Sequence, residues 1–104
     1  MSYPPVMHVE CKSGRAPEPL FEGRLKERRR PRGVYDLSVS QIETPLGVPL
    51  EMKVYYDSRN DRGGLSVTSS HKSLLWLSPL TRQSTVILTL HTDEEFVVSL
   101  RDAT

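Results

Sequence analysis

The stretch LEMKVYY, residues 50–56, decides the fold because its side chains alternate along the chain. Every second position is apolar or aromatic: Leu50, Met52, Val54 and Tyr56. The positions between them carry Glu51, Lys53 and Tyr55. Residues two apart share one face of a β-strand, so this pattern predicts a strand with one buried face and one wetter face.

The same alternation recurs on both sides of this stretch. Residues 34–42, 85–92 and 95–100 repeat it, and residues 7–11 and 19–25 show it over shorter runs. Turn residues separate the runs, at 44–49 and 92–94 and in a longer polar loop expected at 57–64. The apolar run 74–77 fits either a buried strand or a single turn of helix, which Pro79 would end. A sustained period of 3.6 residues occurs nowhere in the sequence, so no long helix is expected.

The spacing of these runs predicts an all-β protein. We expect a small antiparallel β-sandwich or barrel of about seven or eight short strands. A chain of 104 residues fits a single domain, residues 1–104. Residues 1–19 are expected to form an extended arm or edge strand followed by a Pro-rich connector, since prolines block regular pairing.

Cysteine usage and hydropathy indicate the compartment. The single cysteine, Cys11, allows no internal disulfide and favours a reducing environment. The N-terminal residues MSYPPVMHVE lack the basic and apolar regions of a secretory signal. Because no apolar run approaches the roughly 18 residues of a membrane span, we expect a cytoplasmic protein without membrane association.

Residues with catalytic or metal-binding chemistry are few. The side chains that could bind zinc are His8, Cys11, His71 and His91. Only His8 and Cys11 are close in sequence, and residues three apart on a strand point to opposite faces. Ser69 and Lys72 match a Ser-x-x-Lys pattern, but the two further motifs of that enzyme class are missing. We therefore predict no enzyme activity, no metal and no cofactor.

A basic stretch, RLKERRRPRG at residues 24–33, is the strongest candidate for function. Residues 1–32 carry eight Lys and Arg against four acidic residues, whereas residues 33–104 carry six against nine. Ten of the basic residues are Arg and four are Lys, which favours bidentate recognition of phosphate or carboxylate. The sequence therefore predicts a local positive field on a nearly neutral molecule.

The predicted site combines this stretch with the polar loop at 57–64. Its candidate polyanion-binding residues are Arg24, Lys26, Arg28, Arg29, Arg30, Arg32, Arg59 and Arg62. Either Tyr35 or Tyr55 could stack on a base nearby. In the alternative interpretation the stretch is a solvated connector, partly neutralised by neighbouring glutamates. The sequence leaves both interpretations open.

Two short patterns in this region resemble the motifs of PilZ domains, which bind a cyclic dinucleotide. Arg28 and Arg32 are similar to their Arg-x-x-x-Arg motif, and Asp36-Leu37-Ser38 to the Asp-x-Ser of their second motif. Gln41 stands where that motif has Gly, and only three residues separate Arg32 from Asp36, where PilZ domains have a pair of strands. We therefore assign no family from the sequence.

Two functions of different classes follow as hypotheses. The first is a non-enzymatic binding module that recognises nucleic acid or a nucleotide through the basic stretch at residues 24–33, which is expected to form an Arg-rich loop. The alternative is a protein-interaction or assembly subunit, either a homo-oligomer or a component of a complex. In that case the same loop would meet an acidic surface, such as the turn at 93–95 of a neighbouring copy, and residues 1–12 would add a strand to a partner sheet.

Overall fold

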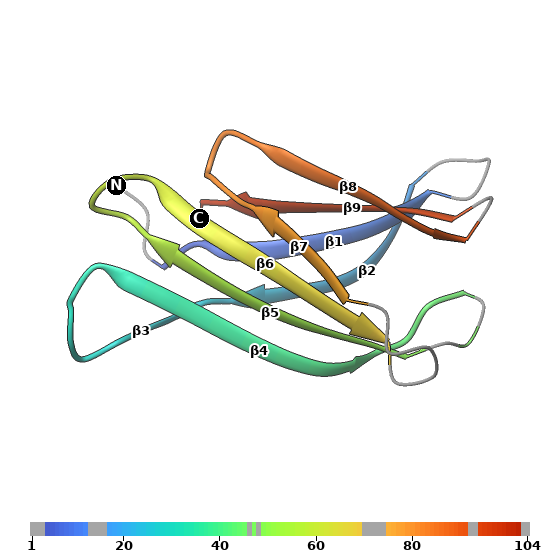
Figure 1. Ribbon diagram of the computed structural model, residues 1–104, viewed down its shortest axis with the longest axis horizontal. Helices are drawn as coiled ribbons and strands as arrows, with labels where there is room; N and C mark the ends of the chain where they lie inside the picture. Colours follow the sequence, from blue (N-terminus) through green and yellow to red (C-terminus); the bar gives the residue numbers. More distant parts are fainter. Residues whose placement is uncertain are drawn as a thin grey trace.

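The computed structural model describes residues 4–12, 17–45, 47, 49–69, 75–91 and 94–102. The described chain forms nine antiparallel strands in two sheets, as Figure 1 shows. The two sheets pack face to face and do not close into a barrel. None of the residues in these ranges is helical. The predicted all-β class is therefore confirmed, as a sandwich.

The four-stranded sheet has the strand order β2-β1-β9-β8. Its members are β1 (Val6–Lys12), β2 (Glu18–Arg24), β8 (Thr85–His91) and β9 (Glu94–Arg101). The five-stranded sheet runs in the order β3-β4-β5-β6-β7. Its members are β3 (Lys26–Glu27), β4 (Val34–Ile42), β5 (Leu50–Asp57), β6 (Arg62–Ser69) and β7 (Leu75–Pro79).

The core lies between the two sheets, on the faces that the alternation predicts. Buried side chains from both sheets form one cluster, which includes Met7, Val9, Cys11, Leu50, Met52, Val54, Tyr56, Val86, Leu88, Phe96, Val98 and Leu100. A bulge between Val39 and Ile42, with Gln41 at a φ of 67°, turns Ile42 back into this core. Burial of this apolar surface is the main term that holds the two sheets together.

β6 was not predicted, and the loop before it is shorter than expected. Arg62, Gly63 and Gly64 belong to this strand and pair with the end of β5, so the connection is a hairpin turn at residues 58–61. This strand is difficult to recognise in the sequence because it contains two adjacent glycines and several Ser and Thr residues, and glycine has a low β-propensity. The ambiguous run at 74–77 contributes to β7, a strand paired with β6.

The prediction that residues 1–12 form an edge strand or an arm is wrong for β1. This strand lies inside the four-stranded sheet and pairs with β2 on one side and with β9 on the other. The edge strand is β2, where a bulge follows Val9 and Pro19 sits opposite Glu10. Because both edges of β1 are occupied by the same chain, the strand cannot extend the sheet of a partner.

The chain passes between the two sheets at two places. Leu25, which is 1% exposed, joins β2 to β3, and its N–H donates to the carbonyl of Pro5 at 2.9 Å. On the opposite side of the sandwich, the connection from β7 to β8 passes directly over Gly63. There the N–H of Leu80 donates to the Gly63 carbonyl at 3.0 Å. A Cβ on Gly63 would collide with the backbone oxygens of Tyr55 and Leu80, so this crossing requires glycine.

Candidate functional site

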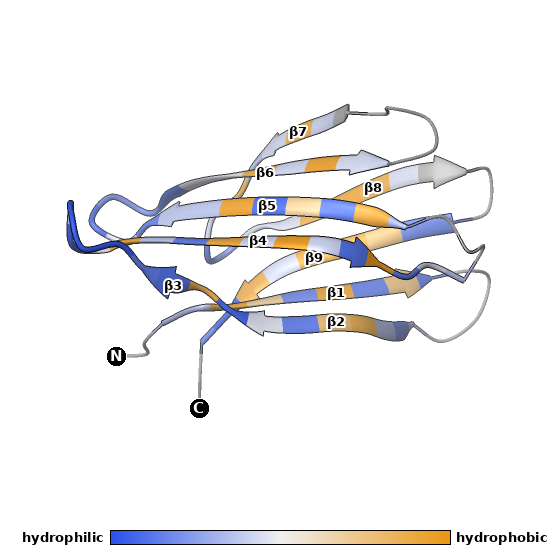
Figure 2. Cartoon of the chain, turned by 90° about the horizontal axis from the view of Figure 1, so that it is seen from below, coloured by the Kyte–Doolittle hydropathy of each residue, from blue (hydrophilic) through white to orange (hydrophobic). Residues whose placement is uncertain are grey.

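The Arg-rich loop, residues 28–33, is the tip of the hairpin between β3 and β4. Its ends are closed by two hydrogen bonds: the Arg28 N–H donates to the Val34 carbonyl at 2.8 Å, and the Gly33 N–H donates to Glu27 Oε2 at 3.0 Å. Gly33 has a φ of 87°, in the left-handed region that favours glycine. The peptide bond between Arg30 and Pro31 is cis. Figure 2 shows this loop as a hydrophilic projection at one end of the sandwich.

A second loop, residues 58–61 between β5 and β6, is docked against the first. Both the N–H and the Oγ–H of Ser58 donate to the carbonyl of Gly33 at 2.8 Å. A Cβ placed on Gly33 would lie 3.1 Å from Cγ of Arg59, so the side chain of Arg59 lies against this glycine. The two loops that carry predicted site residues are therefore brought together by contacts between residues 25 positions apart.

Asp61 anchors the second loop to the rest of the sandwich. Its carboxylate accepts from the Tyr56 hydroxyl at 2.5 Å and from the Arg82 N–H at 3.1 Å. Arg82 in turn lies 6.0 Å from the centre of the Tyr56 ring and pairs with Asp102 at 2.7 Å. Burial and the bond to Asp61 raise the pKa of Tyr56, and the donated hydroxyl lowers the pKa of Asp61. This network fixes the position of the second loop.

Two of the eight predicted site residues are paired with acidic side chains. Nε of Arg28 donates to Asp36 Oδ2 at 2.6 Å. Arg59 binds Asp57 through two bonds of 2.9 Å, which lowers the pKa of that carboxyl. Both pairs are exposed at the surface, so they restrain the side chains more than they stabilise the fold.

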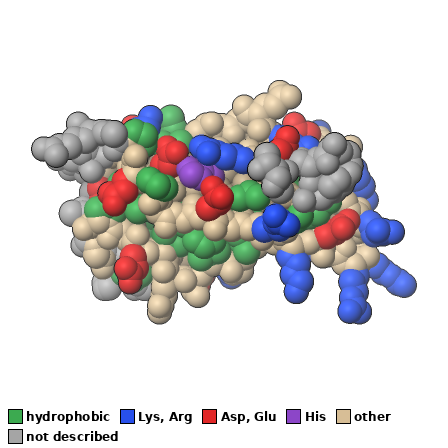
Figure 3. Space-filling view, turned by 180° about the vertical axis from the view of Figure 1, so that it is seen from behind, with side chains coloured by type: hydrophobic (Ala, Val, Ile, Leu, Met, Phe, Trp, Pro, Cys, Tyr) green, Lys and Arg blue, Asp and Glu red, His purple; other side chains and the backbone are tan. Residues whose placement is uncertain are grey.

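The other six predicted site residues are exposed, and none has an ion-pair partner among the described residues. They are Arg24, Lys26, Arg29, Arg30, Arg32 and Arg62. With Arg28 and Arg59 they form what we call the basic end, where β2 ends, β6 begins and both loops lie. Figure 3 shows Lys and Arg side chains projecting from this end of the molecule. The structure thus places the eight residues selected from the sequence at one end of the sandwich, with Arg24 on the four-stranded sheet and Arg28 on the outer face of the five-stranded sheet.

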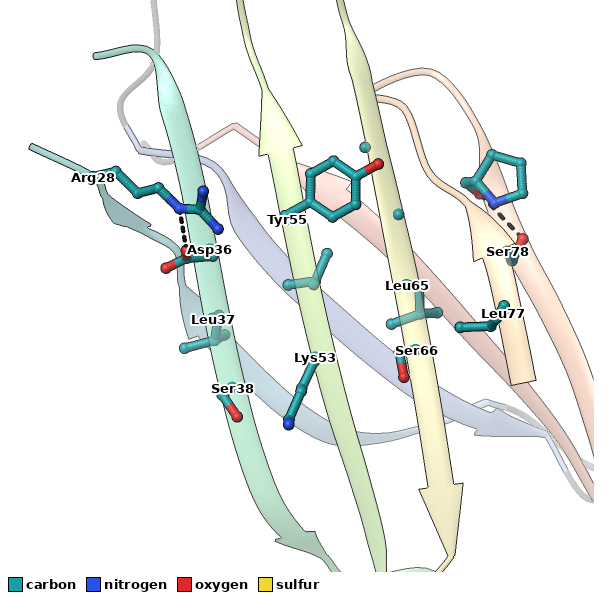
Figure 4. A pocket seen from close by; sticks show the side chains of 14 residues that line it. Arg28, Asp36, Leu37, Ser38, Lys53, Tyr55, Leu65, Ser66, Leu77 and Ser78 are labelled. Carbon is teal, nitrogen blue, oxygen red and sulfur yellow. Dashed lines mark hydrogen bonds and ion pairs between the residues drawn. The ribbon is translucent and has the colours of Figure 1, made fainter. Parts of the chain in front are cut away.

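A depression of about 770 Å³ lies next to the basic end, on the outer face of the five-stranded sheet. Figure 4 shows the side chains that line it, from Arg28 and Asp36 on one side to Leu77 and Ser78 on the other. Tyr55 is 50% exposed and Leu77 is 71% exposed. The sequence indicated the exposed position of Tyr55. It did not indicate that β6 and β7 would help to line this depression, because their positions depend on pairing between strands.

The two described residues considered for metal binding, His8 and Cys11, lie on opposite faces of their sheet. Cys11 is buried in the core as a free thiol, whereas His8 lies on the outer face of the four-stranded sheet, between Glu10 at 2.8 Å and Glu22 at 3.0 Å. His71 and Lys72 lie outside the described residues, as does the side chain of His91. Within the described ranges, no group of three His, Cys, Asp or Glu side chains could hold a metal ion.

The acidic turn considered as a partner surface is only partly exposed. Glu94 and Glu95 belong to β9, and the side chain of Glu94 is buried. Asp93 lies outside the described residues. Glu94 is therefore unsuited to meet the Arg-rich loop of a neighbouring copy.

Comparison with known proteins gives no match to a protein-family model, to a curated protein or to a solved structure. The short resemblance to PilZ domains therefore has no support from a family match. In the part of the chain that the structure describes, no helix is long and apolar enough to cross a membrane.

Proposed function

We propose that this protein is a non-enzymatic cytoplasmic module that binds a polyanion, nucleic acid or a nucleotide, through its basic end. The observation that carries the proposal is the set of six exposed cationic side chains without a carboxylate partner among the described residues. Such side chains can replace the cations that are condensed on a polyanion, and the release of those counterions contributes free energy to binding.

The docked loops favour this function over that of a solvated connector. The bonds from Ser58 to the Gly33 carbonyl hold Arg59 beside the Arg-rich loop, and the network at Asp61 holds the second loop in turn. A ligand that binds several of these side chains therefore has little backbone to order, which lowers the entropic cost of association. A mere connector would not require two loops to be fixed to each other.

The test is the binding of a labelled single-stranded DNA oligonucleotide, followed by fluorescence anisotropy over a range of salt concentrations. We expect binding at about 50 mM salt that weakens steeply as salt increases. Replacing Arg29, Arg30 and Arg32 together by Gln should reduce the slope of log K against log salt by about 2, because each phosphate contact on a single strand contributes about 0.7.

A matched control removes one exposed charge elsewhere. Lys12 is exposed at the end of β1, away from the Arg-rich loop, so Lys12→Gln should leave the slope nearly unchanged while Arg30→Gln lowers it. Failure of the wild-type protein to bind at low salt, or equal slopes in these two variants, would contradict the proposal.

A second candidate function, self-assembly, is favoured by the free edge of β8. This strand lies at the edge of the four-stranded sheet and contains no Lys, Arg, Asp, Glu or Pro. Ile87 in its middle is 54% exposed. The other edge of that sheet, β2, carries a proline, charges and a bulge, which are features that discourage pairing between molecules. An antiparallel pair of β8 strands from two copies would join the two sheets without bringing like charges together.

Sedimentation velocity over a range of concentrations tests this candidate. Dimers should form in the wild-type protein and be lost in Ile87→Lys, because a charge on an edge strand opposes pairing. Val97→Lys is the matched control, since Val97 is the neighbour of Ile87 on the interior strand β9 and should leave the dimer intact. A wild-type protein that stays monomeric throughout would exclude assembly through this edge.

A further inference from the structure

Tyr55 presents the face of its ring on the outer surface of the five-stranded sheet. It lies on β5 directly opposite Gly64 on β6, and a Cβ placed on Gly64 would lie 2.7 Å from Cε1 of Tyr55. The ring therefore lies across the glycine, where a side chain would otherwise stand. With half of its surface exposed, the ring is available for stacking with a planar ligand.

The surroundings of this ring combine apolar surface with a small number of polar groups. Leu77 and Pro79 come from β7, and the hydroxyls of Ser38 and Ser66 come from β4 and β6. Within the described part of the chain, neither of these two hydroxyls has a hydrogen-bond partner. An apolar depression with a few free donors and acceptors, of about 770 Å³, is typical of a site for a small ring system.

The charge around the depression favours an anionic ligand. Arg28 and Lys53 line it. Its acidic lining side chain, Asp36, is paired with Arg28 at 2.6 Å, and Nζ of Lys53 lies 4.0 Å from Oε1 of Glu51, which is outside the lining. Arg28 is also the first residue of the Arg-rich loop. The depression is therefore continuous with the basic end, because Arg28 belongs to both, and Figure 4 shows Arg28 and Tyr55 lining the same depression.

From this continuity we infer that the depression binds an unpaired nucleobase of a single-stranded nucleic acid, stacked on Tyr55, while the adjoining phosphates contact the basic end. The inference rests on the proposed function and adds the class of ligand. In a duplex the bases are already stacked and paired, so only a single strand can supply a free base. A polyphosphate, which has no ring, would leave the Tyr55 ring and Leu77 uncovered.

The test compares two labelled oligonucleotides of equal length, one with bases and one abasic, which carry the same number of phosphates. We expect tighter binding of the oligonucleotide with bases. Tyr55→Ala should weaken that binding by roughly 5- to 150-fold, the effect of losing one stacked base, and should leave binding of the abasic strand unchanged. Tyr55→Phe, which keeps the ring, should bind as the wild-type protein does.

Two further variants separate this site from other effects. Leu77→Ala, on the opposite wall of the depression, should weaken binding only of the oligonucleotide with bases. Val97→Ala is the control, because Val97 is half-buried on the interior strand β9 of the other sheet, away from both the depression and the β8 edge. It should change neither affinity, and thermal unfolding of each variant verifies that it is folded.

The outcomes distinguish this inference from the proposed function. If neither oligonucleotide binds, the proposed function fails and the inference fails with it. If both oligonucleotides bind equally, or Tyr55→Ala weakens both to the same extent, the base site is refuted while polyanion binding by the basic end stands. Tighter binding to a duplex than to the single strand of the same sequence would also refute it.

Discussion

Gly63 and Gly64 are neighbours on β6, and alanine at Gly63 should destabilise the protein far more than alanine at Gly64. In an unstrained strand, replacing glycine by alanine stabilises a protein by about 0.4–1 kcal/mol, because the unfolded chain loses freedom. At Gly63 the new methyl group would meet the backbone oxygens of Tyr55 and Leu80, the latter at 2.8 Å. Neither oxygen can move without disturbing the pairing of β5 with β6 or the crossing between the sheets.

Overpacking of this kind costs about 1–3 kcal/mol. For a domain of this size a loss of 1 kcal/mol lowers Tm by about 4–8 °C, so Gly63→Ala should lower it by roughly 4–24 °C. At Gly64 the methyl group would meet only the ring of Tyr55, a half-exposed side chain that can rotate away. We therefore expect the Tm of Gly64→Ala to stay within a few degrees of the wild-type value, and oligonucleotide binding to fall because the ring is displaced.

Thermal unfolding followed by circular dichroism measures both variants, and urea unfolding gives the matching free energies. Equal stability of the two variants, or a Gly63→Ala protein as stable as the wild type, would refute the close approach of the β7–β8 connection to β6. Loss of stability in Gly64→Ala alone would contradict the exposed position of the Tyr55 ring.

Three further predictions concern the core and the network at Asp61. Tyr56→Phe removes a buried hydroxyl that donates to Asp61, and should lower the free energy of unfolding by about 1 kcal/mol in urea titrations; an unchanged value would exclude a net contribution from this bond. The bonds from Tyr56 and Arg82 lower the pKa of Asp61. Its carboxylate therefore stabilises the fold fully above the unfolded pKa of about 3.9, and this contribution is lost as the pH falls through the folded pKa. Between about pH 5 and pH 2, the free energy of unfolding should fall less in the Asp61→Asn variant than in the wild-type protein. Parallel plots of this free energy against pH for the two proteins would contradict the prediction. Leu25→Ala, at the crossing from β2 to β3, should cost about 2–5 kcal/mol in the same urea assay, and a cost under about 1 kcal/mol would mean that this crossing is not packed as described.

Much of the fold is predictable because burial on one face imposes a period of two. Met52, Val54 and Tyr56 are buried as their spacing indicates, and the same holds for the strands at either end of the chain. β6 was not predicted because Gly63 and Gly64 have no side chains that could show the alternation. The position of β1 depends on pairing with strands far along the chain, which a local pattern does not contain. The nearby prolines therefore indicated a free arm where the structure has an interior strand.

The candidate site was predictable in composition but not in arrangement. Clustered arginines in the sequence indicate a positive field, wherever they lie in the fold. That Arg59 lies beside them depends on the bonds from Ser58 to the Gly33 carbonyl, which join two separate hairpins. Among the described residues Arg28 has an acidic partner and Arg30 has none. This difference depends on the register of β3 against β4, which places Asp36 within reach of Arg28.

Chemical-shift mapping tests most directly whether the basic end is a polyanion site. A single-stranded DNA oligonucleotide is titrated into the isotopically labelled protein, and the backbone amide shifts are followed. Binding at the basic end predicts that the largest changes occur at residues 28–30, 32–33 and 58–62, with little change at residues 43–44 in the connection at the opposite end of the sandwich (Figure 1). Large changes at that opposite end, with the two docked loops unaffected, would contradict it.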